Sequence, residues 1–134
     1  MTSKVNYLGD LRTSAIHIAS DKNIITDAPI DNQGKGEAFS PTDTVATALA
    51  SCLLTIMGIK ARDLNIDIKN TTAEVAKIMA SKPRRISEIQ ITVNFTKSYD
   101  QRIKKILEKA ALACPVSNSL HPDLKQNILF NWPS

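Results

Sequence analysis

Apolar and polar residues alternate in several short stretches of the chain, which is typical of β-strands with one buried face. Two polar clusters, Ser20–Asn23 and Ser81–Arg84, have the composition of turns and separate such stretches. The pattern therefore predicts strands as a pair within Val5–Ile25 and then over Leu64–Ile68, 72–80, Ile89–Phe95 and Ile128–Trp132.

A long apolar helix is predicted to follow Ser40. Ser40 can cap the helix, Pro41 suits its first position, and Asp43 has the spacing of a capping-box acid. The next residues, Thr44–Arg62, are apolar on nearly every face, so the helix should be buried all round. A domain of 134 residues cannot easily surround such a helix with its own chain. We therefore expect a second copy to cover part of it, as a homodimer.

A second, amphipathic helix is predicted near the C-terminus. Its apolar positions from Ile103 to Cys114 keep steps of three and four, and lysines occupy the other face. Ser98 and Gln101 have the spacing of a capping box at its start. Pro115 interrupts the pattern and opens a short further helical turn that ends at Leu120.

Strands and helices are segregated along the chain rather than strictly alternating, so the predicted class is α+β with mainly antiparallel sheets packed on a long central helix. The length fits a single domain, residues 1–134. Hydrophobic residues make up 43% of the chain and charged residues 22%, which excludes wholesale disorder.

The distribution of apolar residues also bears on location. The N-terminal segment has no apolar run of the kind a signal peptide needs. The longest apolar stretch, Val45–Ile59, is interrupted by small polar residues and is expected to be too short to span a bilayer. We therefore expect a cytoplasmic protein with no membrane partner, whose cysteines are reduced.

The net charge of +4 is unevenly distributed: residues 1–51 carry a balance of −2 and residues 52–134 a balance of +6. A basic half can indicate a nucleic-acid-binding domain. Here the basic residues are dispersed, and few aromatic residues lie between them to stack on bases. A solvated basic face, with no nucleic-acid partner, is the preferred interpretation.

The two cysteines are the main candidates for chemistry. Either alone would be interpreted as a small buried apolar residue. As a pair they also suggest redox chemistry, because Cys114 stands where a new helical turn begins and could gain thiolate character there. Cys52 lies inside its helix and would need a cation from elsewhere in the fold. Arg12 is the best candidate, although an exposed strand arginine is the simpler interpretation.

Neither histidine builds an evident site with the cysteines. His17, His121 and the two cysteines are all far apart in sequence, and no pair has the short spacing of zinc ligands. No metal is therefore expected. A Cys–His hydrolase stays open at this point, because a triad is assembled by the fold and not by spacing.

Three segments resemble motifs of the OsmC/Ohr family, named for osmotically induced protein C and organic hydroperoxide resistance protein. Phe39–Cys52 is similar to the segment that leads to the family's first cysteine. Ala113–Leu120 resembles its second motif, a cysteine followed by Pro-Val at the start of a short helix. Tyr7–Arg12 resembles the N-terminal strand that carries the family's active-site arginine.

The resemblance implies an intertwined α+β homodimer with active sites at the interface. It also implies a thiol-dependent peroxidase that acts on organic hydroperoxides. Cys52 would be the peroxidatic cysteine, Cys114 would resolve it as a disulfide, and Arg12 would hold the thiolate and the peroxide. No bound cofactor is implied, and a small dithiol or a lipoylated protein would supply the electrons.

The chain departs from the hydroperoxide-resistance branch at one position. That branch has a glutamate ten residues before the first cysteine, which pairs with the arginine, whereas this chain has Thr42. Asp43 and Glu37 are the candidate replacements. Because of this departure, a non-enzymatic redox-sensing or small-molecule-binding module on the same fold is the alternative prediction.

Overall fold

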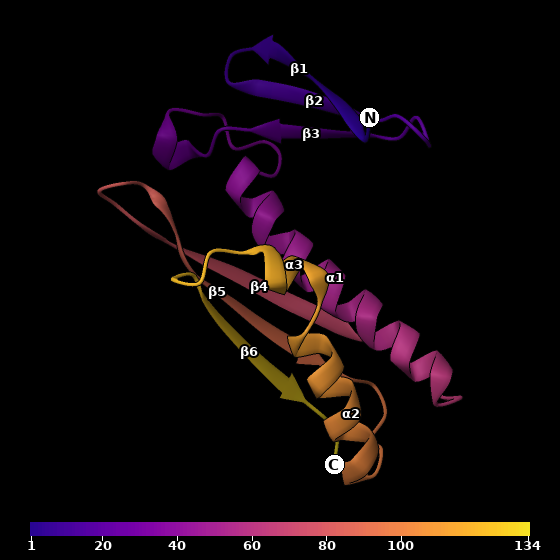
Figure 1. Cartoon of the computed structure of the whole chain (residues 1–134). Coiled ribbons are helices and arrows are strands. Elements are labelled where there is room, and N and C mark those ends of the chain that lie inside the picture. Colours follow the sequence, from indigo (N-terminus) through magenta and orange to yellow (C-terminus); the bar gives the residue numbers. More distant parts are fainter. The chain divides into compact units, whose positions relative to one another are not determined.

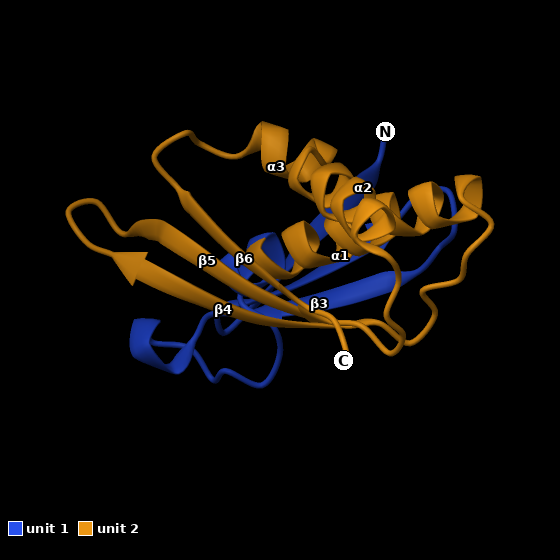
Figure 2. Cartoon of the chain, turned by 90° about the horizontal axis from the view of Figure 1, so that it is seen from below, with its two compact units in different colours: residues 1–45 blue, residues 46–134 orange.

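The computed structural model describes all residues, 1–134, and the chain forms two compact units, Met1–Val45 and Ala46–Ser134. Figure 2 colours these units separately, and the boundary falls inside the long helix α1 (Pro41–Asp63). The strands and helices of both units are labelled in Figure 1.

The first unit is a three-stranded antiparallel sheet in the order β1 (Ser3–Gly9), β2 (Arg12–His17) and β3 (Asn23–Asp27). The sequence predicted only two strands in this region. The additional turn between β1 and β2 was missed because it consists of Asp10 and Leu11, both with positive φ, and leucine is an unusual residue for such a turn. A short 3₁₀ helix, η1 (Ile30–Asn32), lies in the loop that follows β3.

The predicted start of α1 is confirmed by its hydrogen bonds. The Asp43 backbone N–H donates to Ser40 Oγ at 3.0 Å, and the Ser40 N–H donates to Asp43 Oδ2 at 3.0 Å. This reciprocal pair is a capping box, which satisfies two backbone donors that the helix itself leaves without acceptors. The helix therefore begins where the sequence predicted.

The second unit contains a three-stranded sheet in the order β4 (Thr72–Ala80), β5 (Arg85–Asn94) and β6 (Lys125–Asn131). The hairpin β4–β5 is antiparallel, whereas β6 pairs parallel to β5. A parallel partner needs a crossover connection, and this one contains α2 (Gln101–Leu112) and α3 (Pro115–Ser119). The predicted α+β class is confirmed, with this one parallel pair in otherwise antiparallel sheets.

The core of the second unit lies where α1 and α2 cover one face of this sheet (Figure 2). Every second residue of β5 points inward, so Ile89, Ile91 and Val93 are all buried. From α1 the core receives Leu49, Leu53 and Met57, and from α2 Leu107 and Ala111.

Two local predictions were wrong. Leu64–Ile68 alternates but forms no strand: the side chains of Leu64, Ile66 and Ile68 pack against the core, while the chain around them finds no partner strand. The N-cap of α2 is Asp100, whose Oδ1 accepts the Ile103 N–H at 2.9 Å, and not Ser98. Asp100 has the extended backbone of a capping residue, which places the helix start two residues later.

The prediction that α1 is buried all round was also wrong for the chain by itself. One face is buried in the core, but a second face is exposed and consists largely of small or apolar residues, among them Val45, Ala48, Ser51, Thr55 and Ile59. With 23 residues, α1 is also long and apolar enough to cross a membrane by length and composition, a property that core helices of globular domains share. The expectation that its apolar stretch is too short for a bilayer therefore does not hold for the whole helix.

Candidate active site

The two cysteines, distant in sequence, are neighbours within the second unit. Cys52 is half-buried in the middle of α1 and packs against the core, and Cys114 is fully buried at the start of α3. The Cys52 thiol lies close enough to Cys114 to raise the pKa of the Cys114 thiol. Both are free thiols, so the pair is in its reduced form.

The local structure fixes Cys114 through the start of α3. Cys114 is the N-cap residue, Pro115 occupies the first helical position, and the Ser117 N–H donates to Cys114 Sγ at 3.4 Å. The short helix predicted after Pro115 is therefore confirmed. The helix start holds the sulfur toward the core, next to the middle of α1.

The expected gain of thiolate character at Cys114 is wrong. Burial raises the pKa of the Cys114 thiol, and the interaction with Cys52 raises it further. The backbone N–H groups of Ser117 and Val116 act in the opposite direction but do not outweigh burial. Cys114 is therefore held as a protonated thiol, which is a poor nucleophile until its environment changes.

Arg12 lies at the start of β2 in the first unit, where it forms a bidentate ion pair with Asp27. Arg12 Nε donates to Asp27 Oδ1 at 2.7 Å, and Nη2 donates to Asp27 Oδ2 at 2.8 Å. The two residues are direct cross-strand partners in the β2–β3 register, so the sheet itself sets this geometry. The hydrogen bond with Asp27 raises the pKa of Arg12, and the same bond lowers the pKa of Asp27.

Glu37 is the second acid on Arg12. Its Oε1 accepts from Arg12 Nη2 at 3.1 Å, and its backbone N–H donates to Asp27 Oδ2 at 3.1 Å. The side chain of Glu37 is 63% exposed, whereas that of Asp27 is only 2% exposed. The other predicted acid, Asp43, takes part in the capping box of α1 with Ser40.

Sequence reasoning missed Asp27, although it is the most buried charged residue of the chain. The available signal was the pairing of Arg12 with Asp27 across two neighbouring strands. That signal required the third strand, which depends on the unrecognised turn at Asp10 and Leu11.

The two histidines lie in other surroundings. His17 Nδ1 shares a hydrogen bond of 2.6 Å with Ser20 Oγ. His121 Nδ1 lies 3.9 Å from Asp123 Oδ2. The structure contains no group of three or more His, Cys, Asp or Glu side chains that could hold a metal ion.

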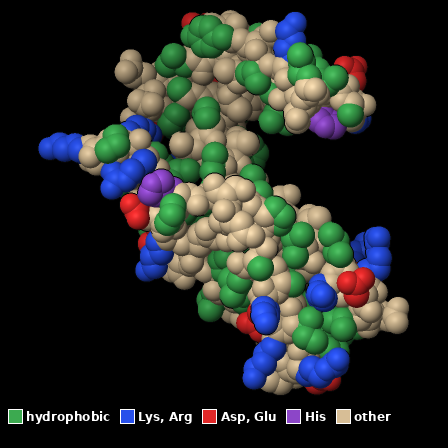
Figure 3. All heavy atoms as spheres, in the orientation of Figure 1, with side chains coloured by type: hydrophobic (Ala, Val, Ile, Leu, Met, Phe, Trp, Pro, Cys, Tyr) green, Lys and Arg blue, Asp and Glu red, His purple; other side chains and the backbone are tan.

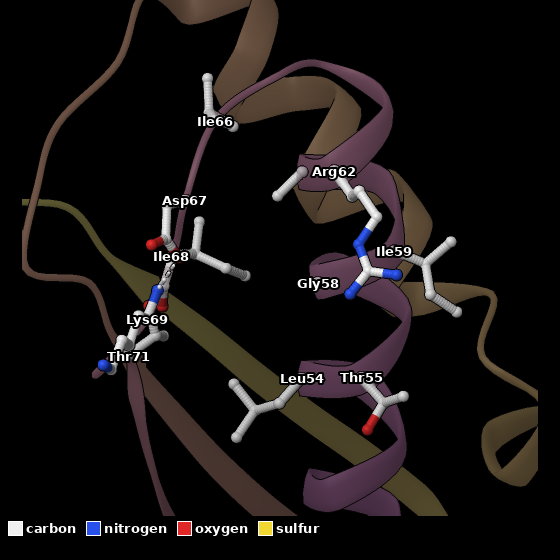
Figure 4. Close-up of a pocket in the computed structure, with 11 residues that line it drawn as sticks. Leu54, Thr55, Gly58, Ile59, Arg62, Ile66, Asp67, Ile68, Lys69 and Thr71 are labelled. Carbon is white, nitrogen blue, oxygen red and sulfur yellow. Dashed lines mark hydrogen bonds between the residues drawn. The ribbon is translucent and has the colours of Figure 1, made fainter.

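A pocket of about 530 Å³ opens beside the second half of α1 (Figure 4). The helix contributes Leu54, Thr55, Gly58, Ile59 and Arg62, and the segment after it contributes Ile66, Asp67, Ile68, Lys69 and Thr71. The lining is largely apolar, with two cationic side chains among it. Such a hollow suits an apolar group of a small molecule or of another protein chain.

Solved structures share the fold of this chain. A protein from Psychrobacter arcticus 273-4, provisionally assigned as an osmotic stress induced and detoxification response protein, is 61% identical with a TM-score of 0.95, over 98% of this chain and 96% of that chain. The organic hydroperoxide resistance protein OsmC of Legionella pneumophila, described as a predicted redox protein, has a TM-score of 0.76 at 15% identity, over 98% and 97%.

An organic hydroperoxide resistance protein of Elizabethkingia anophelis has a TM-score of 0.77 at 14% identity, over 99% of this chain and 97% of that chain. At such identities these last two structures show the fold alone. The fold and the paired thiols thus place the molecule among the OsmC/Ohr-like α+β proteins. A search of curated proteins found no significant match.

The family assignment rests on the sequence itself. The model of the family described as OsmC-like protein matches residues 34–128, which is more than half of the chain and includes both cysteines. The chain belongs to the OsmC-like protein family, as the resemblance of its two cysteine motifs predicted.

Proposed function

We propose that this protein is a thiol-dependent peroxidase that reduces organic hydroperoxides, with Cys52 as the peroxidatic cysteine and Cys114 as the resolving cysteine. The observation that carries the proposal is the proximity of the two free thiols, one half-buried and one fully buried, which is close enough for Cys52 to act on the pKa of Cys114. Membership of a family that includes organic hydroperoxide resistance proteins supports the same reaction class.

The first step forms a bond between sulfur and oxygen. The Cys52 thiolate attacks the terminal oxygen of R–O–O–H, the O–O bond breaks, and the alkoxide leaves with a proton as the alcohol R–OH. The sulfur is oxidised by two electrons to a sulfenic acid, Cys52–SOH, and the peroxide is reduced by the same two electrons.

The second step uses the neighbouring thiol. The Cys114 thiol attacks the sulfur of the Cys52 sulfenic acid, a disulfide forms and water leaves. The two-electron oxidation is then held in the disulfide between the two residues. An external dithiol, either a small molecule or a lipoylated protein, then reduces the disulfide by thiol–disulfide exchange. No bound cofactor takes part, and a cytoplasmic location would keep the resting thiols reduced.

Arg12 is proposed to stabilise the reacting anions. A guanidinium stays charged at any working pH and offers donors to a thiolate and to a peroxide oxygen. Its ion pair with Asp27 supports this role, because a fixed guanidinium does not have to be ordered at the moment of reaction.

We further propose that the protein acts as a homodimer. The exposed face of α1 contains Val45 and Ile59, and the sheet of the first unit exposes Val5, Tyr7 and Ile24. Figure 3 shows hydrophobic side chains at the surface of both units. A second copy would remove this apolar surface from water. Sedimentation as a monomer at micromolar concentration would contradict it.

The function is tested by peroxide consumption with dihydrolipoamide as the electron source, comparing an organic hydroperoxide with hydrogen peroxide. Cys52→Ser should abolish the consumption of cumene hydroperoxide. Arg12→Ala should slow the first step and leave the protein folded, but less stable, because the buried Asp27 carboxylate loses its cation. If Cys52→Ser keeps full activity, the mechanism is wrong.

The second candidate function is a redox-sensing or small-molecule-binding module without efficient turnover. The raised pKa of the Cys114 thiol and the apolar pocket beside α1 favour this alternative. Mass spectrometry after one equivalent of cumene hydroperoxide separates the two. Rapid and specific formation of a Cys52–Cys114 disulfide favours the enzyme, and slow or scattered oxidation favours the module.

A further inference from the structure

The environment of Arg12 contains two acids with the same charge that differ in burial and in their hydrogen bonds to the guanidinium. Asp27 is buried, makes two hydrogen bonds to the guanidinium, and is the cross-strand partner of Arg12. Glu37 is mostly exposed and makes one longer hydrogen bond, to Nη2. Two carboxylates on the same cation therefore need not have the same role.

The backbone around Asp27 is held on both sides. The Asp27 N–H donates to the carbonyl of Phe39 at 3.0 Å, and the Ala28 N–H donates to the carbonyl of Leu11 at 3.0 Å, directly before Arg12. Asp27 Oδ2 also accepts the backbone N–H of Glu37. A carboxylate fixed in this way defines the plane and direction of the guanidinium bound to it.

The hydrogen bonds of Arg12 leave a specific part of the guanidinium for a ligand. Asp27 uses the Nε proton and one Nη2 proton, and Glu37 uses the other Nη2 proton. Neither carboxylate accepts a hydrogen bond from Nη1. An anionic ligand at Nη1 would meet a single positive charge that is already paired with two carboxylates. Lys35 offsets part of this negative charge through its effect on Asp27.

We propose that Asp27 is the positioning residue that fixes Arg12 for thiol chemistry, and that Glu37 competes with the anion that Arg12 serves. The inference rests on the proposed function, in which Arg12 stabilises the Cys52 thiolate and the peroxide. It assigns opposite effects to the two acids. Loss of the Asp27 charge removes the orientation of the guanidinium, whereas loss of the Glu37 charge removes a competitor and one unit of negative charge.

The experiment compares Asp27→Asn and Glu37→Gln in the full-length protein, with Asp21→Asn as the matched control. Asp21 is an exposed turn residue of the same sheet with φ of 61°, a conformation that asparagine adopts readily. The rate of Cys52 sulfenic acid formation with cumene hydroperoxide is measured first. The second readout is the pH profile of Cys52 alkylation by iodoacetamide, followed by peptide mass spectrometry.

Asp27→Asn should slow sulfenic acid formation roughly tenfold or more, because a charge-assisted pair is lost, and should move the alkylation profile to higher pH. Glu37→Gln should accelerate the reaction by roughly two- to fivefold, the scale of an exposed ion pair, and move the profile to lower pH. Asp21→Asn should match the wild type in both. A purely structural role of Asp27 would lower the unfolding temperature and leave the pH profile unchanged.

A double-mutant cycle separates this inference from the proposed function. In an Arg12→Ala background, Asp27→Asn and Glu37→Gln should have no further effect on the rate, because both act through the guanidinium. If Arg12→Ala itself leaves the rate unchanged, the proposed function of Arg12 fails. If Arg12→Ala slows the reaction but Glu37→Gln also slows it or has no effect, the competition is refuted. Glu37 is exposed, so this arm stays informative even if Asp27→Asn does not fold.

Discussion

Replacement of Cys114 tests the most buried part of the candidate site. The Cys114 side chain is 0% exposed, belongs to the core cluster, and caps α3 through its sulfur. Cys114→Ala removes the sulfur that caps α3, which costs about 1 kcal/mol. It also removes a buried atom the size of a methylene, which costs about 1 kcal/mol of transfer free energy, so the total loss of stability is about 2 kcal/mol. Cys114→Ser keeps a capping oxygen but buries a hydroxyl in an apolar core, so a loss of about 1 kcal/mol is expected.

The assay for stability is equilibrium unfolding in urea at one fixed protein concentration, because a dimer would make the midpoint depend on concentration. With an m-value of about 1.5 kcal/mol/M, a loss of 2 kcal/mol lowers the midpoint by about 1.3 M. Cys114→Ala should therefore unfold at the lowest urea concentration, Cys114→Ser between it and the wild type. An alanine variant as stable as the wild type would refute the assignment of Cys114 as both cap and core residue.

The same variants separate the two chemical steps. Both lack the second sulfur, so both should form the Cys52 sulfenic acid with one equivalent of hydroperoxide and both should fail to turn over with a dithiol. Formation of the sulfenic acid at the wild-type rate would show that the Cys52 site is still folded, so a loss of turnover in the same variant would be attributed to the missing thiol. Full turnover by either variant would show that Cys114 is not the resolving cysteine.

Two further predictions concern the helix start and the buried ion pair. Asp100→Ala should lower the free energy of unfolding by about 1 kcal/mol because α2 loses its cap. Ser98→Ala should change it little, and equal losses in the two variants would contradict the assignment of Asp100 as the capping residue. The lowered pKa of Asp27 means that its carboxylate stabilises the folded state above the ordinary aspartate pKa of about 4, and that this contribution is lost as the pH falls through the lower folded-state pKa. Urea midpoints measured from about pH 2.5 to pH 6 should therefore fall less steeply in acid for Asp27→Asn than for the wild type. Parallel curves would show that the Asp27 carboxylate has the same pKa in the folded and unfolded states.

The elements with a clear local pattern could be predicted from the sequence. The capping box at Ser40, the amphipathic period of α2 and the helical turn after Pro115 all depend on residues within a few positions of one another. The alternation in Leu64–Ile68 was misleading, because burial of every second side chain produces the same pattern whether or not a partner strand is present. The turn at Asp10 and Leu11 lacks the glycine or asparagine that normally marks it.

The sequence alone determined which two sulfur atoms the chain has, the helices that carry them, and the family motifs around them. Only the tertiary structure decided that these thiols are neighbours, that burial raises the pKa of Cys114, and that Asp27 holds Arg12. The physical reason is the range of the interactions involved. A cap or an amphipathic period is written in neighbouring residues, whereas burial and cross-strand pairing depend on segments that meet only after the chain has folded.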